Sequence, residues 1–291
     1  MPTRTGNFPI GFRRGWTEWF KDTPKLAAWA KQNGFESIDL NRATLDDIAE
    51  VKNAGLKLGS VDLIDLGNIT HPDLGKRKEL LAANLAYIKE STAAGAKIFF
   101  TIVGADPTKK RNENYKIAVD SFAPLTEAAA TAGATIAMEG YPGGSPQLAL
   151  LATTPETCRA MLKDVPRGLS LNYDPSHLIR LGVDHVRFLK EFIGHVAHVH
   201  GKDTELFPEA AYELGLYQPA AFSQSHGFGE FAWRYTLPGH GVARWTEIFK
   251  ILSGGGYKGL VSVELEDENF NGTETGEKTG LLHSLNYLRG A

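Results

Sequence analysis

The sequence predicts an α/β fold, a single (β/α)8 TIM barrel formed by residues 1–291, and three observations lead to that prediction. Short apolar segments alternate with longer amphipathic segments over about 250 residues, the usual length of such a barrel. The short segments are almost continuously apolar, as parallel strands covered on both faces are. The chain also lacks the early Gly-rich phosphate loop that a doubly wound nucleotide-binding sheet usually carries.

The expected strands share a short, apolar composition. They are residues 8–12, 36–40, 57–63, 97–103, 135–139, 169–174, 196–200 and 259–264. Helical patterns are expected over residues 24–33, 44–55, 76–95, 112–133, 154–164, 183–190 and 244–256. In the second of these helices, Thr44 is the expected N-cap and Gly55 the stop signal.

Residues 204–238 break this rhythm, directly after the seventh strand. The segment is long, rich in aromatic residues, and carries glycine and proline. Long segments without regular structure on a compact domain are usually functional or disordered, and the aromatic residues argue against disorder. We interpret it as a lid-like insertion over the mouth of the barrel. A structural excursion or an oligomer contact is the alternative.

Composition narrows the class of partner. Lys and Arg number 31 against 34 Asp and Glu, a net charge of −3, so nothing calls for nucleic acid or an anionic membrane. The single cysteine, Cys158, excludes an internal disulfide and a cysteine-based zinc site. No apolar run has the length of a signal peptide or membrane helix, so a cytoplasmic location is expected. A homo-oligomer is possible.

Four polar residues end consecutive expected strands: Glu139, Asp174, His200 and Glu264. In a barrel of this kind, the carboxyl ends of the strands meet at one mouth, where active sites lie. Three carboxylates brought together repel one another, and a divalent cation removes that repulsion. The mixed oxygen and nitrogen donors suit one ion, with Mn²⁺ expected first and Mg²⁺, Co²⁺ or Zn²⁺ as alternatives.

Five short motifs then show a family resemblance: "MEGYP", "LNYDPSH", "HVHGKD", "LPGHGVARW" and "VSVELED". They resemble the sugar-phosphate isomerase/epimerase superfamily of xylose-isomerase-like barrels, which includes ketose 3-epimerases, inosose dehydratases and endonuclease-IV-type repair enzymes. The resemblance implies metal ligation by Glu139, Asp174, His200 and Glu264. It also implies that His177, one turn after Asp174, faces a substrate hydroxyl; a helix-start residue behind the site is the alternative.

Further candidates for substrate binding lie near these ligands. The resemblance implies that Arg234, just before the "PGHG" turn, binds substrate. Lys202 is a candidate to hold a substrate oxygen, and Asp203 a candidate to orient His200 or a metal-bound water, with a solvated pair as the alternative. Trp16 follows the first strand and is a candidate wall of the mouth, although an ordinary surface position explains it equally well.

The histidines of "HVAHVHGKD" are separated by strand alternation. Side chains two residues apart share a face of a strand. If His200 points into the mouth, His198 lies one layer deeper as an interior hydrogen-bonding residue. His195 then starts the strand and faces the helices. The cluster is therefore expected to supply one ligand.

The expected chemistry is proton abstraction next to a carbonyl. A divalent ion polarises the carbonyl, and Glu139 and Glu264 are suited to act as base and acid on opposite faces of an enediolate. We expect a metal-dependent isomerase or epimerase of a ketose or keto-sugar. The alternative is a lyase or dehydratase of the same enediolate type, acting on an inosose or a 3-keto-glycoside.

Two other classes of protein share this barrel or its residue types. A three-metal repair nuclease needs further histidines, and Trp233-Arg234-Tyr235 stands where such enzymes carry an Asp-x-His ligand pair. A non-catalytic binding barrel is also an alternative, and elemental analysis that finds no bound metal would favour it.

Overall fold

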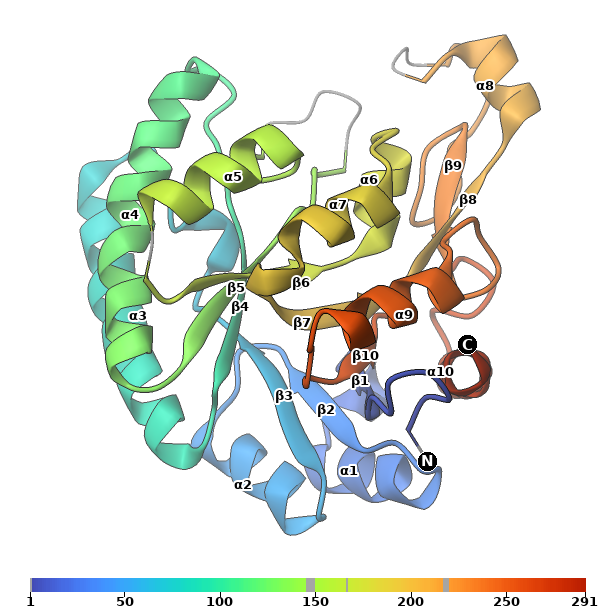
Figure 1. The fold of residues 1–291 in the computed structure, drawn as a ribbon, viewed down its shortest axis with the longest axis horizontal. Coiled ribbons are helices and arrows are strands. Elements are labelled where there is room, and N and C mark those ends of the chain that lie inside the picture. The colour runs from blue at the N-terminus through green and yellow to red at the C-terminus, as the bar shows by residue number, and fades with distance from the viewer. Residues whose placement is uncertain (1, 145–149, 166, 217–219) are drawn as a thin grey trace.

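Eight parallel strands close into a barrel in the computed structural model, which describes residues 2–144, 150–165, 167–216 and 220–291. Around the barrel the strand order is β1-β10-β7-β6-β5-β4-β3-β2 (Figure 1). The parallel pairing closes between the first and last strands, where Phe12 lies opposite Val263. The predicted fold class is therefore confirmed.

Each barrel strand overlaps one of the expected apolar segments. The strands are β1 (Ile10–Arg13), β2 (Ser37–Leu40), β3 (Lys57–Asp62), β4 (Ile98–Ile102), β5 (Thr135–Glu139), β6 (Leu169–Tyr173), β7 (Val196–Gly201) and β10 (Val261–Val263). Most of their residues are buried, because helices cover the outer face and side chains fill the interior.

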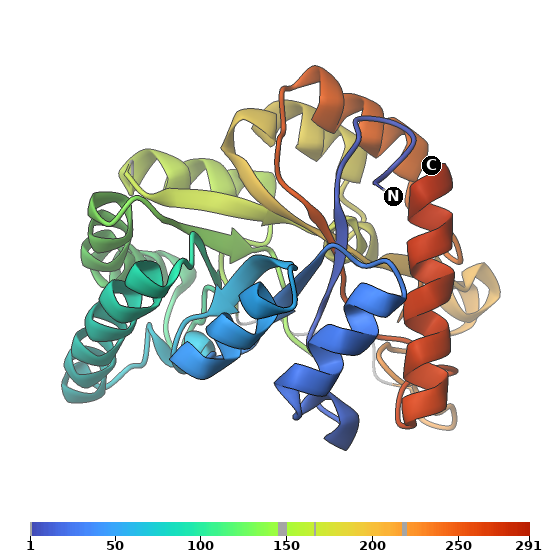
Figure 2. The same cartoon turned by 90° about the horizontal axis from the view of Figure 1, so that it is seen from below.

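Helices surround the barrel, as Figures 1 and 2 show. They are α1 (Thr23–Gln32), α2 (Leu45–Asn53), α3 (Leu74–Ala94), α4 (Arg111–Thr131), α5 (Pro155–Asp164), α6 (Pro175–Arg180), α7 (His185–Phe192), α9 (Trp245–Gly254) and α10 (Glu274–Gly290). Short 3-10 turns occur at Glu18–Phe20, Leu66–Asn68 and Ile193–His195. None of the helices in the described ranges is both long and apolar enough to cross a membrane.

Local sequence explains where these helices begin and end. Thr44 caps α2 through a capping box with Asp47, and Gly55 follows the helix at a φ of 72°, a conformation that glycine adopts without strain. The sequence pattern missed α6, α10 and a short helix within residues 204–238. The short α6 begins directly after β6, with Asp174 as its N-cap, and the C-terminal α10 packs against β1 and β10.

The insertion has a regular base. β8 (Asp203–Leu206) and β9 (Trp233–Thr236) form an antiparallel two-stranded ribbon in which Thr204 lies opposite Tyr235. The short helix α8 (Pro208–Leu214) follows β8, buries none of its residues, and lies away from the barrel strands in Figure 1. Residues 217–219 of the predicted lid lie outside the described residues. The ribbon thus stands beside the mouth, while α8 points outward.

Candidate metal centre

Glu139, Asp174, His200 and Glu264 meet at the carboxyl ends of β5, β6, β7 and β10. Each offers one ligand atom, and these atoms all lie within 4.8 Å of one another. The first three are buried, and the Glu264 side chain is 15% exposed. The strand-end argument therefore brings together the four residues that it selected.

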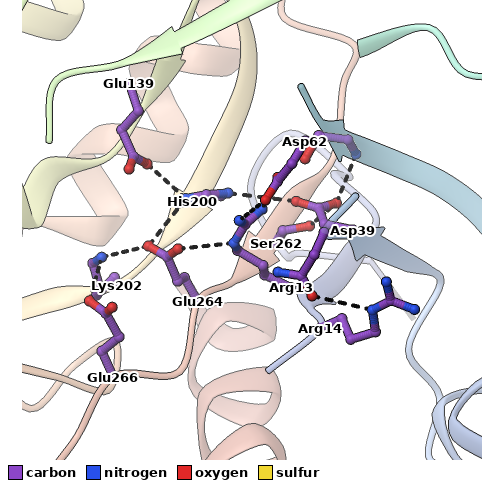
Figure 3. Close-up of polar contacts among 12 residues, drawn as sticks. Arg13, Arg14, Asp39, Asp62, Glu139, His200, Lys202, Ser262, Glu264 and Glu266 are labelled. Atoms are coloured by element: carbon purple, nitrogen blue, oxygen red, sulfur yellow. Dashed lines mark hydrogen bonds and ion pairs between the residues drawn. The ribbon is translucent and has the colours of Figure 1, made fainter. Parts of the chain in front are cut away.

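The donor set fits a divalent ion. The buried Asp174 Oδ2 accepts no hydrogen bond from the residues that the structure describes. His200 Nδ1 lies 2.8 Å from Glu139 Oε1 and 3.3 Å from Glu264 Oε2 (Figure 3). An imidazole nitrogen and three carboxylates converging in this way are the ligands that Mn²⁺, Mg²⁺ or Zn²⁺ would take, and those four residues would hold the ion.

Lys202 adds a buried positive charge to this cluster. Its Nζ lies 2.5 Å from Glu264 Oε2, 2.9 Å from Glu266 Oε2 and 3.3 Å from Asp174 Oδ2. Burial by itself lowers the pKa of Lys202, but the three nearby carboxylates, Glu264 first, raise it well above its ordinary value. The ammonium group therefore stays protonated beside two of the candidate ligands.

The two candidate catalytic carboxylates are held in the charged form. Burial raises the pKa of Glu264, but the charges of Lys202 and His200 outweigh burial and place the pKa well below its usual range. Burial and the charge of Glu264 raise the pKa of Glu139, whereas His200 and His177 lower it, and the net shift is downward. Both residues therefore present charged carboxylates to the mouth.

A second layer of polar groups lies beneath the ligands. His198 is buried and places Nε2 2.6 Å from Asp39 Oδ2, as strand alternation predicts for an interior histidine. Ser262 Oγ donates to Asp39 Oδ1 at 2.8 Å, and His200 Nε2 lies 3.6 Å from Asp39 Oδ2. His195 is exposed and ends the 3-10 turn before β7, so it does not begin the strand as expected. Asp39 thus lies where it can orient His200, the usual role of a carboxylate behind a ligating histidine.

Arg13 crosses the mouth from the other side. Its guanidinium donates to both oxygens of Asp62, at 2.7 Å and 2.6 Å, and its Nε lies 3.3 Å from Glu264 Oε1. It also stacks over the ring of Phe100, 4.5 Å from the centroid.

Sequence reasoning missed Asp39 and Asp62. Their signal was an acidic residue inside an otherwise apolar strand, which is rarely buried without a partner.

His177 lies against two of the candidate ligands, and its contact with a substrate hydroxyl stays a prediction. Its Nε2 is 3.2 Å from Glu139 Oε2 and 3.5 Å from Asp174 Oδ2, and its Nδ1 is 2.6 Å from the hydroxyl of Tyr235. Glu139 Oε1 also accepts a hydrogen bond from Asn172 Nδ2 at 2.6 Å. Both oxygens of Glu139 are therefore held by neighbouring side chains.

Arg234 and Asp203 both pair with residues outside the donor set, and substrate binding by Arg234 stays a prediction. Arg234 pairs with Glu205 at 2.8 Å and with Glu268 at 3.2 Å, because alternation along β9 turns it away from the face on which Tyr235 meets His177. Asp203 does not orient His200; it accepts hydrogen bonds from the backbone N–H groups of Gly239 and Ala243 and so fixes the turn after β9.

Trp16 lies at the rim rather than in the centre. Its side chain is 75% exposed, and it lines a small open pocket together with Arg13, Phe228, Glu264 and Glu266. A wall position for Trp16 therefore agrees with the structure, and its contact with substrate stays a prediction.

Metal binding is expected to release a proton. Burial lowers the pKa of His200, but the charges of Glu264 and Glu139 raise it well above its ordinary value of 6.5, so the ring is protonated in the metal-free protein. A ligating imidazole must be neutral. Below the pKa of His200, apparent affinity should therefore fall about tenfold per pH unit. Calorimetric titration in two buffers of different ionisation enthalpy should count about one proton released per ion, and a count of zero would contradict this.

Comparison with known proteins places this geometry in a family. Residues 27–291 match the family model described as a xylose isomerase-like TIM barrel. An inosose dehydratase from Geobacillus thermodenitrificans is 32% identical over 156 residues, which cover 54% of this chain and 48% of the relative. The chain spans about half the length of the curated relatives it matches.

Solved structures show the same fold at low identity. The apo 3-keto-D-glucoside 4-epimerase YcjR from E. coli has a TM-score of 0.70 and 16% identity, covering 97% of this chain and 99% of that one. The IOLI protein with a bound zinc atom has a TM-score of 0.66 and 19% identity, covering 97% and 95%. The closed barrel and the match over residues 27–291 show that the chain belongs to the xylose isomerase-like TIM barrel family.

Proposed function

We propose that this protein is a metal-dependent isomerase or epimerase of a ketose or keto-sugar. The observation that carries the proposal is the four-residue donor set at the barrel mouth, with Glu139 and Glu264 on either side of His200. The named relatives, an inosose dehydratase and a 3-keto-D-glucoside epimerase, support a keto-sugar as the class of substrate. The net charge of −3 supports a small molecule rather than nucleic acid, and a cytoplasmic location is proposed with it.

A divalent ion bound by these residues would polarise a substrate carbonyl and make the adjacent C–H more acidic. Mn²⁺ is the ion proposed first, and the zinc atom of the IOLI protein supports testing Zn²⁺ beside it. Either Glu139 or Glu264 would take the C–H proton as a base. The other carboxylate would first gain a proton from solvent or from a substrate hydroxyl and would then deliver it to the opposite face. His177 Nε2 and Lys202 Nζ lie beside these carboxylates and would hold substrate oxygens during the transfer.

A lyase or dehydratase is the second candidate, and the position of Lys202 favours it. Its protonated Nζ lies 2.5 Å from Glu264 Oε2. A substrate whose C–H faces Glu264 would therefore also place a neighbouring hydroxyl near Lys202. After a carboxylate removes the C–H proton, a β-hydroxyl could leave as water by taking a proton from Lys202. The first step is shared with isomerisation, so the donor set alone fits both reactions.

An isotope experiment separates the two. The purified protein would be loaded with Mn²⁺ and incubated in D₂O with ketoses, 3-keto-glucosides and an inosose. Epimerisation predicts a product of unchanged composition carrying one deuterium at the inverted carbon. Elimination predicts loss of water or aglycone and a new conjugated carbonyl absorbance. If no substrate exchanges a proton and elemental analysis finds no metal, the enzyme proposal is wrong and a binding barrel takes its place.

A further inference from the structure

We infer that Arg180 and Tyr235 act as positioning residues that set the tautomer of His177, so that its Nε2–H points into the metal centre as a hydrogen-bond donor. The inference deepens the proposed function, because it assigns a direction to the group that would hold a substrate oxygen. It also gives the insertion a part in the site, since Tyr235 lies on β9 of the ribbon.

A continuous chain of hydrogen bonds links these groups to Glu139. Arg180 Nη1 donates to the hydroxyl of Tyr235 at 2.8 Å. The same hydroxyl lies 2.6 Å from His177 Nδ1, and His177 Nε2 lies 3.2 Å from Glu139 Oε2. His177 is 1% exposed and Tyr235 is 4% exposed, so water has little access to compete for these contacts.

The chemistry of Arg180 gives the chain one direction. A guanidinium has only donors and stays protonated, so the Tyr235 oxygen must accept from it. Burial raises the pKa of Tyr235, so the hydroxyl keeps its own proton. In the described ranges, the hydrogen-bond partners of that hydroxyl are Arg180 and His177. Its proton therefore goes to His177 Nδ1, because otherwise a buried donor would be left unpaired.

The other side of the ring requires the same tautomer. A neutral imidazole carries one N–H, so a His177 whose Nδ1 accepts must be protonated on Nε2. The neighbours of Nε2 are carboxylate oxygens of Glu139 and Asp174, which accept and do not donate. Both ends of the ring thus select the Nε2–H form independently.

Arg180 is itself held in place by aromatic rings. Its guanidinium carbon lies 4.1 Å from the ring centroid of Trp233, a contact typical of a cation–π interaction. Trp233 and Tyr235 are two residues apart on β9 and share a face of the ribbon, so the ribbon fixes both the stacking surface and the hydroxyl. The insertion therefore reaches the metal centre through Tyr235 and His177, and Arg180 is held against the rings of the ribbon.

Nuclear magnetic resonance can read the tautomer directly. The protein would be labelled with ¹⁵N-histidine, treated with chelator, and brought to a pH at which the ring of His177 is neutral. A spectrum of His177→Gln assigns its signals. We expect Nε2 of His177 to be protonated and Nδ1 to be an unprotonated acceptor, before and after addition of diamagnetic Zn²⁺. Protonation of Nδ1 in the neutral ring would overturn the inference.

Variants then test which residues set this state. Tyr235→Phe and Arg180→Met should each give a mixture of tautomers at His177, whereas Arg180→Lys keeps a donor-only cation and should preserve the Nε2–H form. Tyr212→Phe is the matched control, since Tyr212 is 83% exposed on α8. The signals of His198, held by Asp39, should not change in any variant and so report an intact barrel. An unchanged His177 tautomer in Tyr235→Phe would contradict the inference.

An activity measurement adds a second readout. With a sugar that the protein turns over, Tyr235→Phe should lower kcat about 10–100-fold, the usual effect of removing a group that orients a site residue, with a smaller change in KM. Because the tautomer is measured without substrate, the inference and the proposed reaction can fail separately. If Tyr235→Phe keeps the kcat of the unmodified protein, the orientation of His177 by Tyr235 does not contribute to turnover.

Discussion

Replacing Glu264 with glutamine is expected to lower turnover by about 10²–10⁴-fold, the usual contribution of a positioned acid or base. The amide cannot take a proton at neutral pH, and it removes one negative charge from the donor set. Glu139→Gln should cause a loss of the same order, because the two carboxylates act on opposite faces of the substrate. Steady-state rates and solvent deuterium incorporation would measure both effects.

The loss should be separable from a loss of metal. Each variant would be assayed at saturating Mn²⁺, with bound metal counted by elemental analysis. Glu268→Gln is the control: this residue contacts Arg234 and His226, outside the donor set. Wild-type turnover in Glu264→Gln would refute a catalytic role for that residue. Full activity in both Gln variants would remove the proposed chemistry.

Lys202→Met is expected to destabilise the metal-free protein and to strengthen metal binding. Without the ammonium group, the negative charges of Glu264, Glu266 and Asp174 repel one another with no nearby lysine to neutralise them. Breaking a buried ion pair costs about 3–5 kcal/mol of folding stability. A divalent ion would then meet a more negative site. Two unit charges 4 Å apart interact by about 1 kcal/mol in water and about 4 kcal/mol near a protein surface. Removal of the lysine charge should therefore raise the affinity for a divalent ion by about tenfold or more.

Thermal unfolding in chelator and competition with a metal indicator would test these opposite signs. Lys190→Met is a suitable control, because that lysine pairs with Glu247 on the surface with 59% of its side chain exposed, and such pairs contribute about 0–1 kcal/mol. Turnover should fall in Lys202→Met if Nζ holds a substrate oxygen. Weaker metal binding in this variant would show that Lys202 supports the ligands rather than competing with the ion.

The barrel could be predicted because the alternation of short apolar segments with amphipathic segments is repeated along the chain. Buried parallel strands must be short and apolar, and polar residues that end them must meet at one mouth, so Glu139, Asp174, His200 and Glu264 followed from position and residue type. Asp39 lies inside β2 and Asp62 ends β3, and both strands precede the four that were used for that argument. A buried acid within "SIDL" and one within "KLGSVD" were available signals.

The insertion could not be predicted from pattern in the same way. A one-residue difference in register exchanges the two faces of a strand, and this is why Tyr235 rather than Arg234 reaches the site. Arg180 is missed for a related reason: its contacts are with Trp233 and Tyr235, which lie more than 50 positions later in the chain. Pairings at that sequence distance depend on tertiary structure, which single-sequence periodicity does not report.

The two-stranded ribbon separates one part of the candidate site from the folding core. The closed barrel supplies the metal donors and the folding core, whereas β8 and β9 supply Tyr235 and Trp233 from outside the barrel. Mutations in the ribbon can therefore alter the environment of His177 while the hydrogen bonds of the barrel strands stay intact. Variation confined to this excursion would change the surroundings of the candidate site without disturbing the strands that carry the donor set.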